Sequence, residues 1–225
     1  RPMNVIGIDR AAPDSFNVWV AGPSLPRLQA RAGQFFQLRF GTRDLWWQHH
    51  PYSMSAVPFA QGLRFTFRST GDDARAFERI RVGTRVWLEG PYGTFTAERS
   101  GGAPVLLIAG GSGIAPLRAI LEDLQPGQRP EVIVRVRRPE DAWFYAELTQ
   151  LVTALGGRLH LVMGSRVALR GQDPFAPGAL AAVVPDLTRR VAFICGPTGM
   201  TRAAMKGLAA AGMPKANIHS ERFDY

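Results

Sequence analysis

The sequence predicts two domains: a small antiparallel β barrel of the Greek-key type, followed by a doubly wound α/β domain with a parallel sheet. Residues 1–100 read as short strands separated by turn residues, a pattern typical of all-β domains. Beyond residue 100, continuous apolar runs alternate with helix-like stretches, which is typical of a buried parallel sheet. We therefore expect one domain over residues 1–100 and a second over residues 101–225.

The barrel is expected to contain strands at residues 5–8, 16–21, 34–40, 63–68 and 85–89. Turn sequences separate them, among them Ala-Gly-Pro-Ser at 21–24 and Gly-Pro-Tyr-Gly at 90–93. One short helix is expected over 74–80, because Asp72 and Asp73 can serve its N-terminus.

The second domain is expected to contain strands at 105–109, 131–136, 159–163 and 191–195 and helices over 116–124, 144–155 and 198–211. Strands of this kind are buried on both faces, which explains their near-continuous apolar sequence. Ligands of doubly wound sheets bind at the carboxyl ends of the strands, so candidate binding residues are sought there.

The composition limits the function classes. The net charge of +9 favours acidic partners in general, such as nucleotides, nucleic acid, anionic lipid or an acidic protein, but a solvated basic surface explains it equally well. Nucleic acid is disfavoured, because the arginines are scattered and no zinc spacing or aromatic RNA-binding signature is present. Cys195 is the single cysteine, which excludes an internal disulfide, a four-cysteine iron–sulfur cluster and a cysteine-based zinc site. No metal site is expected.

Two glycine turns follow strands of the second domain. The sequence from Gly110 to Pro116 comes directly after the strand 105–109 and opens a helix, and the sequence from Cys195 to Met200 repeats this arrangement after the strand 191–195. Glycine allows the backbone to approach a pyrophosphate, and a helix N-terminus offers it free N–H groups. The alternative is a turn that only packs tightly. The two turns can face one crevice.

With these turns placed, six segments resemble, in order, the ferredoxin-NADP reductase superfamily. They are His50-Pro51-Tyr52-Ser53, Leu63-Arg64-Phe65-Thr66-Phe67-Arg68, Gly90-Pro91-Tyr92-Gly93, the Gly110 to Pro116 turn, Cys195-Gly196-Pro197 with Met200, and Ile218-His219-Ser220-Glu221-Arg222-Phe223. The resemblance is closest to the dehydrogenase domain of ferric reductases and NADPH oxidase-like membrane proteins. It implies that FAD binds the barrel and that NADPH binds the second domain.

The resemblance assigns roles to the flavin segment. Tyr52 would stack on the flavin ring and the Ser53 hydroxyl would lie near its N5 atom, which suits an aromatic face and a hydroxyl that can donate or accept. Soluble members usually carry Arg where this chain has His50, whereas His-Pro is the form seen in the membrane proteins. Arg68 and the backbone from Gly71 to Ala74 would then neutralise the pyrophosphate. A Ser or Thr is common in the family at the position of Ala74, so this chain lacks that hydroxyl contact.

The resemblance also assigns roles to the C-terminal segment and to the segment after the strand 159–163. Glu221 and Phe223 match an acid and an aromatic residue beside the flavin, although Tyr225 could take the stacking role instead. Ser165 and Arg166 match the position that grips the 2′-phosphate of NADPH, and arginine suits that group by charge and bidentate geometry. Arg135, Arg137 and Arg138 could add positive potential. NADPH is therefore expected, with NADH as the alternative.

The complete set of expected cofactor-binding residues is His50, Pro51, Tyr52, Ser53, Thr66, Arg68, Gly71, Gly110, Gly111, Ser112, Gly113, Ile114, Pro116, Ser165, Arg166, Cys195, Gly196, Pro197, Met200 and Phe223. The residues expected to act in hydride transfer are Ser53, Cys195, Glu221 and Phe223.

Three functions remain open at this stage. In the favoured one, the chain lies on the cytoplasmic face of the cell membrane and passes electrons from NADPH through FAD to a haem in an upstream membrane domain, with ferric iron or oxygen as final acceptor. The chain begins at Arg1 rather than Met, so we expect it to be a fragment. The alternative is a soluble, cytoplasmic reductase of a ferredoxin, a flavodoxin or an oxygenase. The third is a nucleotide-binding module without catalysis.

Overall fold

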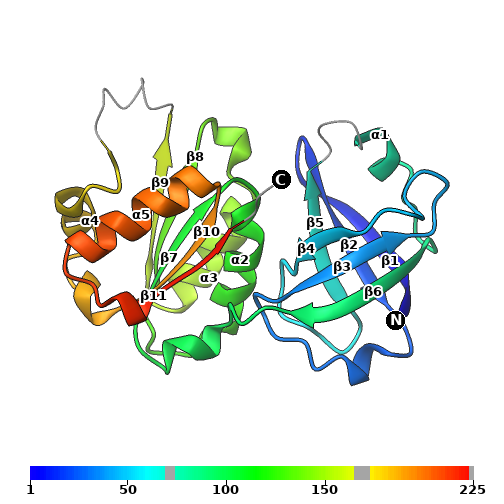
Figure 1. Cartoon of the computed structure of the whole chain (residues 1–225), viewed down its shortest axis with the longest axis horizontal. Helices are drawn as coiled ribbons and strands as arrows, with labels where there is room; N and C mark the ends of the chain where they lie inside the picture. Colours follow the sequence, from blue (N-terminus) through cyan, green and yellow to red (C-terminus); the bar gives the residue numbers. More distant parts are fainter. Residues whose placement is uncertain (69–73, 165–172, 223–225) are drawn as a thin grey trace.

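The computed structural model describes residues 1–68, 74–164 and 173–222. Its strands form two separate sheets, a six-stranded one from residues 2–92 and a five-stranded one from residues 105–222 (Figure 1). The predicted order, an antiparallel barrel followed by a parallel α/β domain, is confirmed.

The first sheet contains β1 (Pro2–Ala12), β2 (Ser15–Ala21), β3 (Phe35–Phe40), β4 (His50–Ser53), β5 (Leu63–Arg68) and β6 (Arg85–Tyr92). Their order is β4-β3-β6-β1-β2-β5, with every pairing antiparallel, and a bridge between Met54 and Phe65 joins the two outer strands. The sheet therefore closes into a barrel. All five predicted strands are present, and β4 adds a sixth.

The barrel core comes from the alternation of side chains along each strand. In β3, Phe36, Leu38 and Phe40 point inward and are fully buried, while the residues between them are partly exposed. The helix α1 (Ala74–Phe77) and the turn after it add Phe77 and Ile80 to this core. The helix expected over 74–80 therefore ends earlier, at Phe77.

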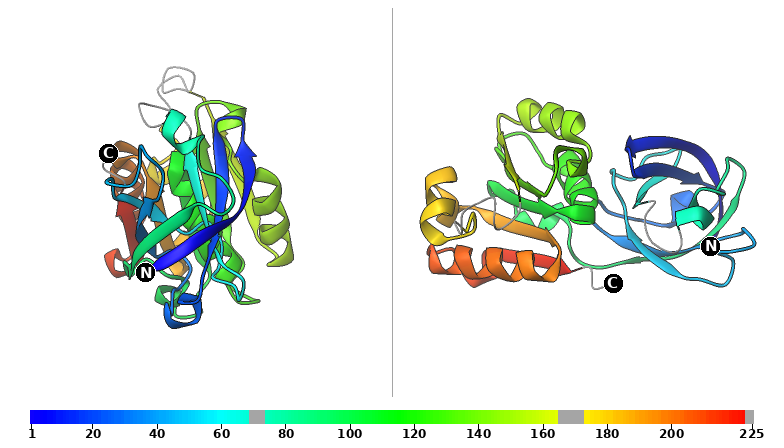
Figure 2. Two further views of the ribbon diagram at one scale, coloured as in Figure 1. Left: turned by 90° about the vertical axis from the view of Figure 1, so that its right-hand side faces the viewer. Right: turned by 90° about the horizontal axis from the view of Figure 1, so that it is seen from above.

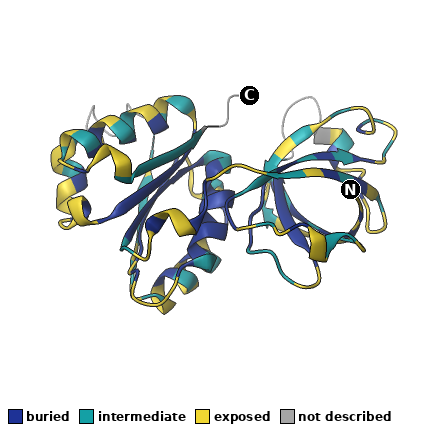
Figure 3. Ribbon diagram, turned by 60° about the horizontal axis from the view of Figure 1, so that its bottom comes forward, coloured by how far each residue is buried: buried dark blue, intermediate teal, exposed yellow. Residues whose placement is uncertain are grey.

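The second sheet contains β7 (Val105–Gly110), β8 (Glu131–Val136), β9 (Arg158–Met163), β10 (Val191–Gly196) and β11 (Ile218–Arg222). All pairs are parallel and the order is β11-β10-β7-β8-β9. The central strands β7 and β10 are buried along their whole length, as Figure 3 shows by their dark blue colour. Their carboxyl ends lie side by side, because Cys195 pairs with Ala109.

Helices cover both faces of the parallel sheet (Figure 2). The pair α2 (Ile114–Asp123) and α3 (Tyr145–Ala154) packs on one face, and the pair α4 (Pro177–Val183) and α5 (Thr198–Ala210) packs on the other. Short 3-10 turns link the elements at Leu25–Arg27, Ala97–Ser100, Gly111–Gly113, Pro139–Asp141, Leu187–Arg189 and Lys215–Asn217. In the part of the chain that the structure describes, no helix is both long and apolar enough to cross a membrane.

Candidate functional site

The two glycine turns contact each other at the carboxyl ends of β7 and β10. A β-carbon at Gly113 would lie 2.2 Å from the Cys195 carbonyl oxygen, and one at Gly196 would lie 2.8 Å from the Gly110 oxygen. Only residues without a side chain allow the turns to approach so closely, because real β-carbons do not come within 3.0 Å of another heavy atom. The sequence expectation that both turns can face one crevice is consistent with this contact.

The residues around the turns divide into those open to a ligand and those that support the backbone. Ser112 is partly exposed and Pro197 is exposed, so both are accessible. Ile114 and Pro116 are buried in the first turn of α2, where they anchor the helix to the sheet. A β-carbon at Gly110 would meet the Met200 sulfur at 2.4 Å, so Met200 packs against the first turn. The helix N-terminus and the turn can therefore offer backbone N–H groups to a phosphate.

Strand β4 places the predicted flavin segment on an aromatic cluster. The Tyr52 ring is half-buried and packs edge-on against Phe67, with ring centres 4.2 Å apart and an interplanar angle of 65°. The His50 ring packs in the same way against Phe77 at 5.2 Å, and Pro51 between them is exposed. Tyr52 is therefore fixed by its neighbours while part of its surface stays open, as a platform for a flat ring requires.

Ser53 fits a hydrogen-bonding role toward a bound group. It is 5% exposed, and its hydroxyl has no hydrogen-bond partner among the described residues. An unpaired buried hydroxyl is costly, which suggests that a ligand completes its bonding. A flavin nitrogen suits such a hydroxyl, so the residues present fit FAD at this strand.

Glu221 lies where the two domains meet. It pairs across β10 and β11 with Cys195, and its Oε1 lies 3.5 Å from the position of a β-carbon built on Gly93, just beyond β6. Phe35 of β3 pairs with Ser53 of β4 on one side and with Tyr92 of β6 on the other. Strand β3 therefore lies between Ser53 and the end of β6, which Gly93 follows. Glu221 therefore adjoins Cys195 within its own sheet and lies beside Gly93 of the barrel, at the end of the strand next to β3.

The Glu221 carboxyl is held in an unusual state. Burial raises its pKa to about 7, and its Oε2 has no hydrogen-bond partner in the described part of the chain. Near neutral pH the group is therefore divided between a protonated form, which can donate a hydrogen bond, and an ionised form, which can only accept. A pKa near the working pH is typical of groups at functional sites.

Cys195 is enclosed at the end of β10. It is 0% exposed, and burial together with the nearby Glu221 charge raises the pKa of its thiol well above the usual value. The thiolate is the reactive form, so we expect the native protein to resist a maleimide reagent at pH 8 and to take up one equivalent in urea. Mass spectrometry of the labelled chain measures this, and rapid labelling of the folded protein would contradict it.

The two predicted side chains on β5, Arg68 and Thr66, already form hydrogen bonds with other residues of the protein. Arg68 donates to Asp14 of the barrel and to Asp141 of the second domain, each at 2.8 Å, and lies over the Trp143 ring. Thr66 donates to the Asn17 Oδ1 at 2.7 Å and forms a hydroxyl–hydroxyl hydrogen bond with Ser55 at 2.8 Å inside the barrel. Arg68 would have to exchange its carboxylates for phosphate oxygens in order to hold a pyrophosphate.

Several predicted residues lie outside the described part of the chain. They are Gly71, Ser165, Arg166 and Phe223, together with Tyr225. Their assigned roles remain predictions.

Known proteins match this chain in sequence over most of its length. Residues 107–206 match the oxidoreductase NAD-binding domain family. The propane 2-monooxygenase reductase component of Rhodococcus jostii is 32% identical over 212 residues, which are 86% of this chain and 55% of that protein. The 3-ketosteroid-9-alpha-monooxygenase ferredoxin reductase component of Mycolicibacterium smegmatis is 32% identical over 203 residues, 88% of this chain and 56% of that protein.

A solved structure shares the whole fold. The FAD/NAD-binding domain of a nitric oxide dioxygenase from Vibrio cholerae superposes with a TM-score of 0.83 at 22% identity, covering 99% of this chain and 98% of that one. This likeness shows that the two chains share a fold, and residues 107–206 are the part of the chain that matches the NAD-binding domain family. The chain spans about half the length of the two curated relatives named above.

A cluster of ionic side chains that the sequence did not predict joins the domains. Arg64 of β5 and Arg118 of α2 both contact Glu147 of α3, at 3.1 and 2.8 Å. Both arginines are nearly buried, with side-chain exposures of 5% and 8%. Burial and the nearby Arg118 charge lower the pKa of Arg64. No sequence pattern signals this contact, because its members come from segments far apart in the chain.

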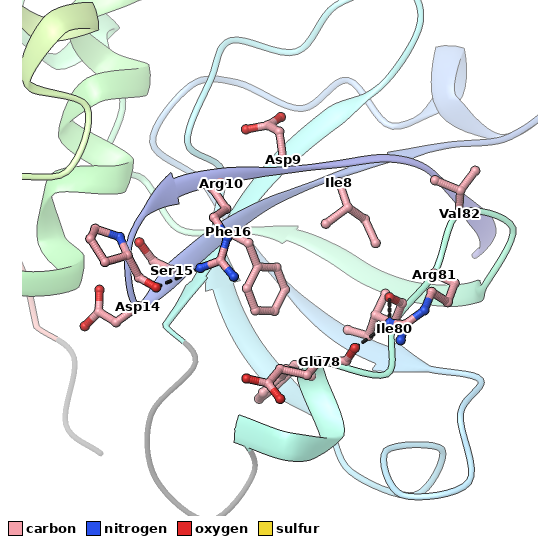
Figure 4. Close-up of a pocket in the computed structure, with 12 residues that line it drawn as sticks. Ile8, Asp9, Arg10, Asp14, Ser15, Phe16, Glu78, Ile80, Arg81 and Val82 are labelled. Carbon is pink, nitrogen blue, oxygen red and sulfur yellow. Dashed lines mark hydrogen bonds between the residues drawn. The ribbon is translucent and has the colours of Figure 1, made fainter.

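The barrel also has a cavity of about 660 Å³ between the β1–β2 hairpin and the segment after α1 (Figure 4). Ile8, Phe16 and Ile80 give it apolar walls, and Arg10 and Arg81 lie at its border. None of the predicted site residues lines it. Its Phe16 ring stacks on Phe67, the residue that supports Tyr52 from another side. The described residues contain no group of three or more His, Cys, Asp or Glu side chains placed to hold a metal ion.

Proposed function

We propose that this chain is the FAD- and NADPH-binding module of a reductase that passes single electrons to a separate protein, such as a ferredoxin or an oxygenase component. The observation that carries the proposal is the position of Glu221, which pairs with Cys195 at the contacting glycine turns and also lies beside Gly93 of the barrel. The names of the two curated relatives, both reductase components of oxygenase systems, support this acceptor class.

The protein's own contribution is binding and orientation. The turns at 110–113 and 195–197 would hold the pyrophosphate of the dinucleotide, and Tyr52 would support the flavin ring. Ser53 would fix the ring by a hydrogen bond, while Glu221 would hold or release a proton beside the hydride path. Bound FAD would accept two electrons as a hydride and pass them on one at a time, while the chain holds FAD and the nucleotide in position.

The choice of NADPH rests on the carboxyl ends of β8 and β9. The Arg135 guanidinium lies there, donating to the carbonyls of Val136, Val162 and Gly164. Its positive charge favours a phosphorylated ribose nearby, and Arg166 is proposed to grip that phosphate directly.

The expected result in solution is a yellow protein whose visible absorption bleaches when NADPH is added without oxygen. NADH should bleach it more slowly, and Arg166→Ala should reduce the preference for NADPH by about tenfold, the value of one charged hydrogen bond. Visible spectroscopy with each nucleotide measures both effects. A flavin that neither nucleotide reduces would contradict the proposal and favour a binding module without catalysis.

A second candidate acceptor is a haem in a membrane domain outside these residues, which would place the chain at the cytoplasmic face of the cell membrane. The observation that favours it is His50, where soluble members of the superfamily usually carry Arg. The full-length protein would then show a haem absorption band that shifts when NADPH is added anaerobically. A full-length protein without haem would remove this candidate and leave the ferredoxin or oxygenase acceptor.

A further inference from the structure

Helix α2 connects the nucleotide turn to the barrel. It starts directly after Gly113, and its later turns lie beside the barrel (Figure 1). Eight of its ten residues, from Ile114 to Leu121, are buried, although Arg118 is among them. Arg118 and Glu122 are one turn apart and form an ion pair. An arginine buried in this position needs partners to offset its desolvation.

These two side chains hold the barrel segment that follows the flavin strand. Arg118 donates to the Ser55 carbonyl oxygen at 3.2 Å. Glu122 accepts a hydrogen bond from the Val57 backbone N–H at 2.8 Å. Ser55 is two residues beyond Ser53 and is fully buried. The backbone next to the predicted flavin-binding hydroxyl is therefore fixed by the domain that carries the nucleotide turn.

The barrel contributes a matching contact from the other side. Arg64 donates to the Ser55 carbonyl at 2.6 Å and to the Ser55 hydroxyl at 3.1 Å. Arg64 and Arg118 also share the Glu147 carboxylate. The partly exposed carboxylates of Glu122 and Glu147 balance the charges of the two buried arginines, so the cluster carries no net charge.

We propose that Arg118 and Glu122 are positioning residues for hydride transfer, holding segment 53–57 so that the Ser53 hydroxyl keeps a set place relative to a nucleotide bound at the start of α2. This inference rests on the proposed function. The span from Gly113 to Glu122 is about 14 Å of helix, a rigid element over that length. Displacement of a reacting group by about 1 Å can lower a rate by about 100-fold. A rigid helix that fixes the distance between the nucleotide turn and segment 53–57 can therefore affect the rate of hydride transfer.

The test compares variants of the FAD-loaded chain by stopped-flow reduction with NADPH. Arg118→Met keeps the length of the side chain but loses its charge, and we expect the saturating rate of flavin reduction to fall about tenfold with the NADPH dissociation constant within about twofold. Arg118→Lys keeps the charge and should recover part of the rate. Glu122→Gln keeps an oxygen for the Val57 N–H and should lose about two- to threefold.

A readout independent of turnover is the hydrogen exchange of segment 53–57 in the chain without substrate. Arg118→Met should raise its exchange, because the contacts of Ser55 and Val57 to α2 weaken. Arg190→Met is the matched control, since Arg190 is equally buried and ion-paired, to Asp186. It should lower the thermal midpoint and leave both the exchange of segment 53–57 and the saturating rate unchanged.

The outcomes separate this inference from the proposed function. A wild-type flavin that NADPH does not reduce would end the proposed function, and the inference with it. A reducible wild type with an unchanged saturating rate in Arg118→Met would end the inference alone, and the cluster would then only stabilise the interface. If Arg118→Met does not fold, Arg118→Lys and Glu122→Gln provide the test. The inference would be overturned if both variants kept the wild-type saturating rate and the wild-type hydrogen exchange of segment 53–57.

Discussion

Replacing Gly113 by alanine is expected to lower the free energy of unfolding by about 2–3 kcal/mol and to weaken NADPH binding at least about tenfold. The backbone conformation at Gly113, with φ −63° and ψ −11°, suits alanine, so backbone strain is not the reason. The reason is space. The new methyl group would lie 2.2 Å from the Cys195 carbonyl oxygen and 2.6 Å from the Gly196 nitrogen. Both are main-chain atoms, so the two turns themselves would have to separate.

Urea unfolding and titration with NADPH measure the two effects of Gly113→Ala. Gly178→Ala is a suitable control, because Gly178 lies in α4 with nothing within 4 Å of an added β-carbon and has no positive φ. That control should stabilise the protein by up to about 1 kcal/mol, the helix preference of alanine over glycine. A Gly113→Ala protein with wild-type stability and affinity would show that the turns tolerate separation.

The glycine turns and the buried strands could be predicted because their causes are local. Val105 to Ala109 is a continuous apolar run whose burial on both faces follows from its composition, and Gly113 follows it at the position where a helix begins. Strand β4 was not among the expected strands, since four residues that include Pro51 show no alternation. Strand β11 depends on pairing with β10, a contact that its own five residues do not determine.

The partners of the predicted site residues could not be predicted from the sequence, because they come from segments far apart in the chain. Arg68 was expected to face a pyrophosphate, and its actual partners, Asp14 and Asp141, are 54 and 73 residues away. Arg118 similarly looks like an ordinary surface residue of an amphipathic helix until the barrel covers it. The residue types of a site are visible in the sequence, whereas the partners that fix them are set by the packing of the two domains.

Glu221→Gln is expected to make the protein more stable than wild type at pH 8 by about 2 kcal/mol, allowing for the part of the carboxyl that solvent reaches. Burial raises the pKa of Glu221 from 4.5 to about 7, so the native state binds more protons than the unfolded state between these values. The free energy of unfolding of wild type therefore falls as pH rises through this window. The amide does not ionise, so the stability difference should grow from near zero at pH 4.5.

Urea unfolding of both proteins between pH 4.5 and pH 8 measures this difference. Glu98→Gln is the matched control, because it makes the same change at a side chain that is 61% exposed and should differ little from wild type at any of these pH values. An equal offset between Glu221→Gln and wild type at every pH would mean that Glu221 ionises normally. The carboxyl would then be charged at neutral pH, and it could not serve there as a proton donor beside the flavin.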